Sequence, residues 1–191
     1  MDFGFTETQK MLCSSSRDFL KANCPGKYVR SMAEDQKGYT SDLWNQMADM
    51  GWMGLIIPEK YGGAGCGLLD LVILLEEMGR VCLPGPFFST IVLGGFSILE
   101  AGSEDQKAQF LSKVAHGKLM LTLALTEASA IDSVVGIRTQ AEQRGNEFII
   151  NGNKLFVPDA SAVDYFVCVA RTKESHVPDD GITLFLEITI V

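Results

Sequence analysis

The spacing of hydrophobic residues changes near Lys118, and this change limits the folds open to the chain. Before that point apolar residues recur every three or four positions, as in residues 41–50, which is typical of helices. After it they alternate with smaller residues, as in residues 121–126, which is typical of strands. We therefore predict an α+β chain. An all-α domain should cover residues 1–118, and a β domain should cover residues 119–191.

Local signals predict where the helices of the first domain begin and end. Two segments carry the capping-box pattern, in which a hydroxyl residue is followed three positions later by Gln. Four residues are expected to cap helices: Thr6, Ser41, Asp70 and Ser103. A short helix is expected over residues 28–34 and an apolar one over residues 87–100. Gly51 should end a helix in the left-handed conformation, and glycines with a proline predict a loop over residues 56–65.

The second domain is predicted to be an incomplete antiparallel β-barrel. Strands are expected over four segments: residues 121–126, 147–150, 165–170 and 183–191. Asn151 followed by Gly152 is a hairpin-turn signal. Because the last strand runs to the end of the sequence, an unpaired edge would be open to another chain. The alternative is a small sheet closed by the strands present.

Composition argues against several classes of function. The sequence has 16 Lys and Arg against 24 Asp and Glu, a net charge of −8, which opposes binding to nucleic acid. No run of eighteen apolar residues exists, so we expect no membrane span. The five cysteines are odd in number and form no CxxC pair, which argues against a disulfide framework or a metal site. The start lacks the pattern of a signal peptide, and a cytoplasmic location is expected.

Several local sequences, read in order, resemble the acyl-CoA dehydrogenase family. They are Gly51-Trp52-Met53-Gly54, Pro58-Glu59-Lys60-Tyr61-Gly62-Gly63, Glu76-Glu77-Met78-Gly79-Arg80, Gly102-Ser103-Glu104-Asp105-Gln106-Lys107, Leu125-Thr126-Glu127 and Ile149-Ile150-Asn151-Gly152-Asn153-Lys154. Their order and spacing match along essentially the whole chain. The resemblance covers the family's N-terminal helical domain and part of its middle, flavin-binding β domain.

This resemblance implies a flavoprotein oxidoreductase of lipid metabolism. The family oxidises an acyl-CoA thioester between its α and β carbons with FAD, as in fatty acid β-oxidation. The family's catalytic glutamate belongs to a C-terminal domain that this sequence does not contain, so no catalytic residue is assigned and the chain alone should be inactive. The resemblance also implies an electron-transfer flavoprotein as partner and a homo- or hetero-oligomer.

The same resemblance carries over seven binding positions. The flavin would contact Leu123, Leu125, Thr126, Phe156, Val157 and Pro158, and the acyl-CoA would contact Asp132. Backbone groups near Leu125 and the Thr126 hydroxyl would bond the pyrimidine edge of the ring. Phe156 would pack on the ring, where the family has Trp.

The sequence departs from the family pattern at three positions, and two of these departures, Asp132 and Pro158, favour an alternative function. Ile131 replaces a Gly, Asp132 replaces a Ser that contacts the acyl-CoA, and Pro158 replaces a hydroxyl that bonds flavin N5. Proline has neither a hydroxyl nor an N–H. The alternative is a non-catalytic or degenerate subunit that pairs with an active partner. An unrelated helical interaction module with a β extension is the third hypothesis.

Four further features are better explained by structural roles. The glycines of residues 62–67 lack the setting of a phosphate loop and predict a turn. Glu76 and Glu77 are adjacent on a helix and do not face one site, so a solvated or capping role is expected. His116 should be a cation at a helix end. His176 lies in a polar loop with too few ligands for a metal.

Overall fold

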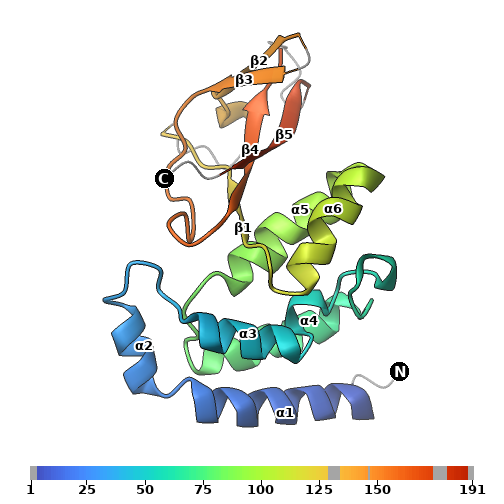
Figure 1. Ribbon diagram of the computed structural model, residues 1–191, viewed down its shortest axis with the longest axis vertical. Helices are drawn as coiled ribbons and strands as arrows, with labels where there is room; N and C mark the ends of the chain where they lie inside the picture. The colour runs from blue at the N-terminus through green and yellow to red at the C-terminus, as the bar shows by residue number, and fades with distance from the viewer. Residues whose placement is uncertain (1–3, 129–133, 146, 174–179, 189–191) are drawn as a thin grey trace.

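The computed structural model describes residues 4–128, 134–145, 147–173 and 180–188. Helices form one end of the molecule and a β-sheet forms the other, with strand β1 leading from one to the other (Figure 1). The predicted α+β architecture is confirmed. No helix within these ranges is long and apolar enough to cross a membrane.

The helical end contains six α-helices and three helical segments of other types within the described ranges. The α-helices are α1 (Glu7–Asn23), α2 (Gly26–Met32), α3 (Ser41–Asp49), α4 (Leu68–Arg80), α5 (Phe96–Ala101) and α6 (Glu104–Ala115). Two 3-10 helices, η1 (Trp52–Gly54) and η2 (Glu59–Tyr61), precede α4, and a π-helix, η3 (Ser89–Gly95), runs directly into α5. Both predicted capping boxes are present, at α1 and α6. Gly51 has the predicted left-handed conformation, with φ of 76°.

Two predictions about the helix caps need correction. Thr40, not Ser41, caps α3, because its hydroxyl accepts the Leu43 N–H. Asp70 is inside α4 rather than at its cap, and its carboxylate reaches back to the N–H of Gly67. The apolar helix expected over residues 87–100 is present, with Ser89–Gly95 as a π-helix, a form that periodicity does not reveal.

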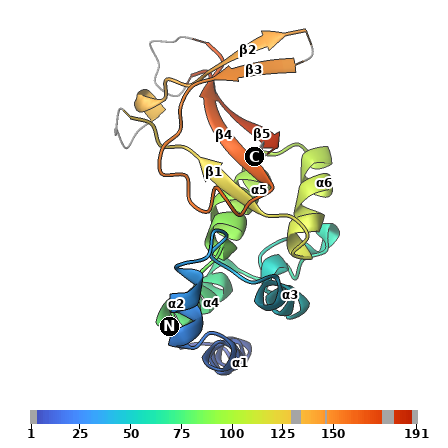
Figure 2. The same ribbon diagram turned by 60° about the vertical axis from the view of Figure 1, so that its left-hand side comes forward.

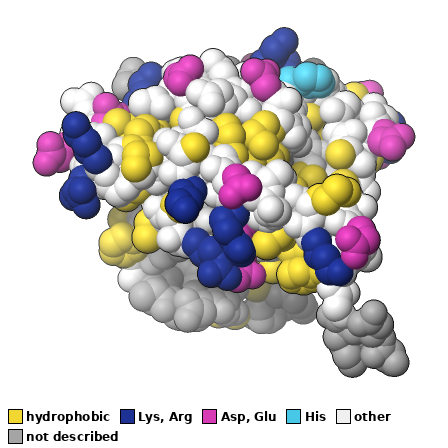
Figure 3. Space-filling model, turned by 90° about the horizontal axis from the view of Figure 1, so that it is seen from below, with side chains coloured by type: hydrophobic (Ala, Val, Ile, Leu, Met, Phe, Trp, Pro, Cys, Tyr) yellow, Lys and Arg dark blue, Asp and Glu magenta, His cyan; other side chains and the backbone are white. Residues whose placement is uncertain are grey.

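A single apolar core joins the helices to one another and to the sheet. Leu20, Leu71, Leu74 and Leu111 are fully buried, and the same cluster continues to Leu121 in β1. Helices α5 and α6 lie beside the sheet, whereas α1 is farthest from it (Figures 1 and 2). Seen from below, hydrophobic side chains gather in patches between charged ones (Figure 3). The sheet is thus supported on one face by the helical core.

The sheet has five strands and is mixed, where the sequence predicted an antiparallel one. The strands are β1 (Leu121–Ala124), β2 (Gln140–Arg144), β3 (Glu147–Asn151), β4 (Tyr165–Arg171) and β5 (Ile182–Ile188). The order is β1-β4-β2-β3, and β5 pairs with β4. Strand β4 runs parallel to β1 and, at one residue pair, to β2, but antiparallel to β5. Two parallel neighbours need a long connection that returns the chain to the starting end of the first strand. Between β1 and β4 this connection includes the β2–β3 hairpin.

The predicted turn at Asn151-Gly152 is wrong. Strands β2 and β3 form the hairpin, with Arg144 opposite Glu147, so the turn includes Gly145, whose φ is 65°. Gly152 instead follows β3 and lies against Thr139: a Cβ on Gly152 would come within 2.3 Å of the Thr139 hydroxyl oxygen. The glycine therefore allows close contact rather than a turn.

Candidate functional site

The end of β1 is hydrogen-bonded to a segment about thirty residues later in the chain. The Leu155 N–H donates to the carbonyl oxygen of Thr126 at 2.9 Å. The Lys154 ammonium donates to the carbonyl oxygen of Leu125 at 3.2 Å. Two of the sequence motifs that suggested a binding site are therefore neighbours in the fold.

The junction of these segments carries an exposed apolar surface. Leu125 is 43% exposed, Leu155 is 40% exposed and Phe156 is 89% exposed. Phe156 has a φ of 51°, a conformation that residues with a side chain seldom adopt. Thr126 is also exposed, and its hydroxyl makes no hydrogen bond with any other residue that the structure describes. An apolar face beside an available hydroxyl suits a flat ligand with polar edges.

The remaining predicted positions lie around this surface rather than on it. Leu123 is half-buried and packs against the helical core. Val157 is half-buried and lines a cavity on the sheet side, while Pro158 is exposed in the turn before β4. Asp132 lies outside the described residues. The structure therefore brings the segments of Leu125, Thr126 and Phe156 together, whereas the side chain of Leu123, two residues before Leu125, packs on the helical core.

A cavity of about 260 Å³ lies on the face of the sheet turned away from the helices. It is lined by Ala124, Thr139, Ile150, Gly152, Lys154, Val157, Ala160, Phe166 and Cys168. Its lining is mainly apolar. The hydroxyl of Thr139 is buried without a hydrogen-bond partner among the residues that are described.

Glu127 and Lys154 form a nearly buried ion pair that the sequence analysis did not anticipate. The Lys154 ammonium lies 2.6 Å from the Glu127 carboxylate, and the two side chains are 10% and 7% exposed. The same carboxylate accepts the backbone N–H groups of Arg138 and Thr139 at 2.7 and 3.1 Å. Burial raises the pKa of Glu127, but these hydrogen bonds outweigh burial and bring the pKa to about 2. Glu127 is thus held as an anion.

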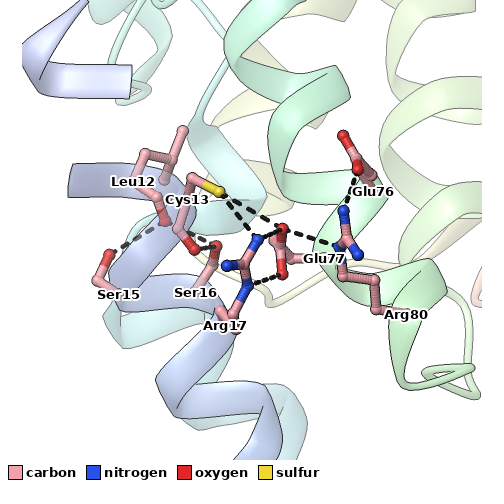
Figure 4. A network of polar contacts seen from close by, with 8 residues as sticks. All are labelled: Leu12, Cys13, Ser15, Ser16, Arg17, Glu76, Glu77 and Arg80. Atoms are coloured by element: carbon pink, nitrogen blue, oxygen red, sulfur yellow. Dashed lines mark hydrogen bonds and ion pairs between the residues drawn. The ribbon is translucent and has the colours of Figure 1, made fainter. Parts of the chain in front are cut away.

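Glu77 is not solvated, and the prediction for it is wrong. Its side chain is 1% exposed and lies between Arg17 of α1 and Arg80 of its own helix, at 2.7 and 3.1 Å (Figure 4). The hydrogen bonds from Arg17 lower the pKa of Glu77 to about 2 against the opposing effect of burial. Glu76 is exposed and pairs with Arg80. Arg80 is three residues from Glu77, but Arg17 is sixty residues away in the sequence, so no local pattern reveals that second partner.

The glycine-rich loop and His116 have structural explanations. The glycines of residues 62–67 follow the 3-10 helix η2, and Gly62, its C-cap, has a φ of 84°. A Cβ on Gly63 would lie 1.9 Å from the carbonyl oxygen of Ile57, so close backbone contact requires glycine there. His116 is at the C-terminal cap of α6, as expected, with Nδ1 2.7 Å from the Ser112 carbonyl oxygen. His176 lies outside the described residues, among which no three metal-ligating side chains cluster.

Comparison with known families matches nearly the whole chain. Residues 6–118 match the family described as "Acyl-CoA dehydrogenase, N-terminal domain". Residues 122–187 match "Acyl-CoA dehydrogenase, middle domain". Isovaleryl-CoA dehydrogenase, mitochondrial, of Pongo abelii is 30% identical over 188 residues, which are 96% of this chain and 44% of that protein.

Solved structures have the same fold. Butyryl-CoA dehydrogenase from Megasphaera elsdenii is 27% identical with a TM-score of 0.83, over 98% of this chain and 50% of that one. A glutaryl-CoA dehydrogenase from Mycobacterium smegmatis in complex with FADH2 is 26% identical with a TM-score of 0.82, over 97% and 46%. The chain therefore spans about half the length of the relatives it matches.

Proposed function

Because the chain belongs to the acyl-CoA dehydrogenase family, we propose that the end of β1 and residues 154–158 form one side of a FAD site. The enzyme concerned would oxidise an acyl-CoA thioester between its α and β carbons. The observation that supports this proposal is the exposure of Leu125, Thr126, Leu155 and Phe156 at the point where their two segments are hydrogen-bonded. The solved relative with bound FADH2 adds support from the family.

The residues at this surface fit an isoalloxazine ring in chemical type. Phe156 offers an exposed aromatic face, which can stack on a flat heterocycle and exclude water from it. The Thr126 hydroxyl can donate or accept at the polar pyrimidine edge. FAD, when bound, supplies the redox chemistry by accepting a hydride. The residues of this chain would hold and orient it.

Several finer points belong to the same proposal. We place the domain boundary at residues 118 and 119, and Asp132 at the acyl-CoA. No residue of this chain is assigned as the base that removes the α proton, so the 191-residue chain by itself should not turn over acyl-CoA. An electron-transfer flavoprotein as electron acceptor, a homo- or hetero-oligomer and a cytoplasmic location are proposed from family resemblance.

A second candidate is a non-catalytic subunit that pairs with an active partner. Pro158 favours it, because proline cannot supply the hydrogen bond that the family pattern gives to flavin N5. Reduction of bound FAD by acyl-CoAs, in the chain with its natural partners, would favour the first candidate. FAD that is bound but not reduced would favour the second.

The proposal is tested by titrating the purified chain with FAD and following flavin fluorescence. We expect saturable quenching that weakens when Phe156→Ser removes the exposed ring or Thr126→Val removes the hydroxyl. The matched control is Phe148→Ser, which removes a phenylalanine of β3 that is 44% exposed. No saturable binding, or equal loss in Phe148→Ser and Phe156→Ser, would contradict the proposal.

A further inference from the structure

The ion pair of Glu127 and Lys154 lies directly between the two segments of the proposed flavin site. Glu127 follows Thr126 in the chain, and Lys154 is two residues before Phe156. The pair therefore flanks the exposed surface without being part of it, since both side chains are about nine-tenths buried.

Lys154 makes two contacts that act on the end of β1. Its ammonium bonds the carbonyl oxygen of Leu125 at 3.2 Å and the carboxylate of Glu127 at 2.6 Å. The Leu155 N–H adds a third link to the intervening Thr126 carbonyl, at 2.9 Å. The Lys154 ammonium and the Leu155 N–H thus hold residues 125–127, at the end of β1, against the segment that follows β3.

Glu127 extends the same network to the start of β2. Its carboxylate accepts the N–H groups of Arg138 and Thr139, so the carboxylate meets three donors in all. Leaving such a buried carboxylate without its cation is unfavourable, because its remaining partners are backbone dipoles. Loss of the Lys154 charge would therefore release the end of β1 as well as the segment after β3.

We infer that Lys154 is a positioning residue of the flavin site, which acts through Glu127 and the Leu125 carbonyl to hold the β1 end in register with Phe156. This inference rests on the proposed function. It concerns geometry rather than ligand contact: Lys154 sets where the Thr126 hydroxyl lies relative to the Phe156 ring. Displacement of such groups by about 1 Å is enough to weaken ligand binding substantially.

The test compares Lys154→Met with Glu77→Gln, which weakens a similarly buried charge network in the helical end. Three quantities are measured in the full chain: the FAD dissociation constant, the visible circular dichroism band of bound flavin at saturation, and the thermal midpoint without FAD. We expect Lys154→Met to weaken FAD binding on the order of tenfold and to change the band. Lys154→Arg should restore both in part. Glu77→Gln should lower the midpoint but leave the constant and band as in wild type.

A Lys154→Met variant with the wild-type constant and band would overturn the inference while leaving the proposed function intact. If that variant does not fold, Glu127→Gln decides, because it keeps the shape of the side chain and removes the charge. It should change the band, and an unchanged constant and band would again overturn the inference. A wild-type chain that binds no FAD would overturn the inference and the proposed function together.

Discussion

The helical end and the sheet of this protein each contain a buried glutamate with a pKa near 2, but the two sit in different surroundings. Glu77 joins two helices that pack on a continuous apolar core. Glu127 lies beside an exposed apolar surface, and its partner Lys154 also lines the cavity on the sheet. The first network stabilises a completed domain. The second stabilises the border of an open surface, which is where a ligand or further protein can be accommodated.

The exposure of the strands sharpens this contrast. In β2 and β3 most residues are exposed, whereas β4 has four consecutive buried residues. Within the described ranges, β3 and β5 each pair on one side only. Mutations in the helices should therefore mainly lower the free energy of unfolding, because they remove buried area. Mutations near the end of β1 should mainly change ligand binding.

The largest loss of stability is expected from a substitution that creates a cavity in the helical core. Leu111 is fully buried, so Leu111→Ala should lower the free energy of unfolding by about 2–5 kcal/mol. Leu155→Ala is the matched change at the proposed site, where the side chain is 40% exposed, and should cost less than about 1 kcal/mol. Urea unfolding followed by circular dichroism measures both. Equal losses would break the distinction between the two regions.

The next effect concerns the network of Figure 4. Glu77→Gln should lower the free energy of unfolding by about 1–3 kcal/mol, because the neutral amide no longer matches the two guanidinium groups. The lower part of that range is expected, since Arg17 and Arg80 are half-exposed and screened by water. Glu76→Gln is the control, with an exposed side chain and little expected change. A similar loss in both variants would contradict the role given to burial.

Acid should destabilise the protein through the same two carboxylates. The pKa of each is lowered from 4.5 to about 2 in the folded chain, so the unfolded chain binds more protons between these values. Stability from these groups is therefore full above about pH 4.5 and is lost as the pH falls toward 2. Unfolding measured from pH 6 to pH 2 should show a shallower decline in Glu77→Gln. An unchanged slope would exclude Glu77 as a contributor.

The smallest effect on stability is expected at the proposed site. Phe156 is 89% exposed, so Phe156→Ser should change the free energy of unfolding by no more than about 0.5 kcal/mol. The same variant should weaken FAD binding. Thermal unfolding with and without FAD separates the two quantities. A large loss of stability without FAD would show that the ring is structural.

Local sequence predicted some features and misplaced others by one to three residues, as at the Ser41 and Asp70 caps, whereas features that depend on distant partners were missed. The capping boxes at Thr6 and Ser103 need only residues three apart, and both are present. Glu77 was predicted to have a solvated or capping role because adjacent glutamates on a helix do not face one site, but it is buried and pairs with Arg17 of α1 as well as with Arg80 of its own helix. The Gly152 turn failed for the same reason: Thr139, which is distant in the sequence, explains the glycine.

The candidate site follows the same rule. Family resemblance singled out Leu125, Thr126 and Phe156, and the fold brings their segments together. Their role in binding flavin stays a prediction. The pairing of Glu127 with Lys154 joins residues from two recognised motifs, yet nothing in either motif alone says that the two side chains meet. Parallel pairing of β1 with β4 is also invisible to strand periodicity, because alternation is the same in both directions.

Hydrogen exchange of the full chain with and without FAD tests the central claim most directly, because it reports on each segment separately. The account predicts slower exchange on FAD addition for the backbone amides of residues 125–128 and 155–157, and no change in α1 or α4. Unchanged exchange in those two segments at saturating FAD, or protection confined to the helices, would contradict it.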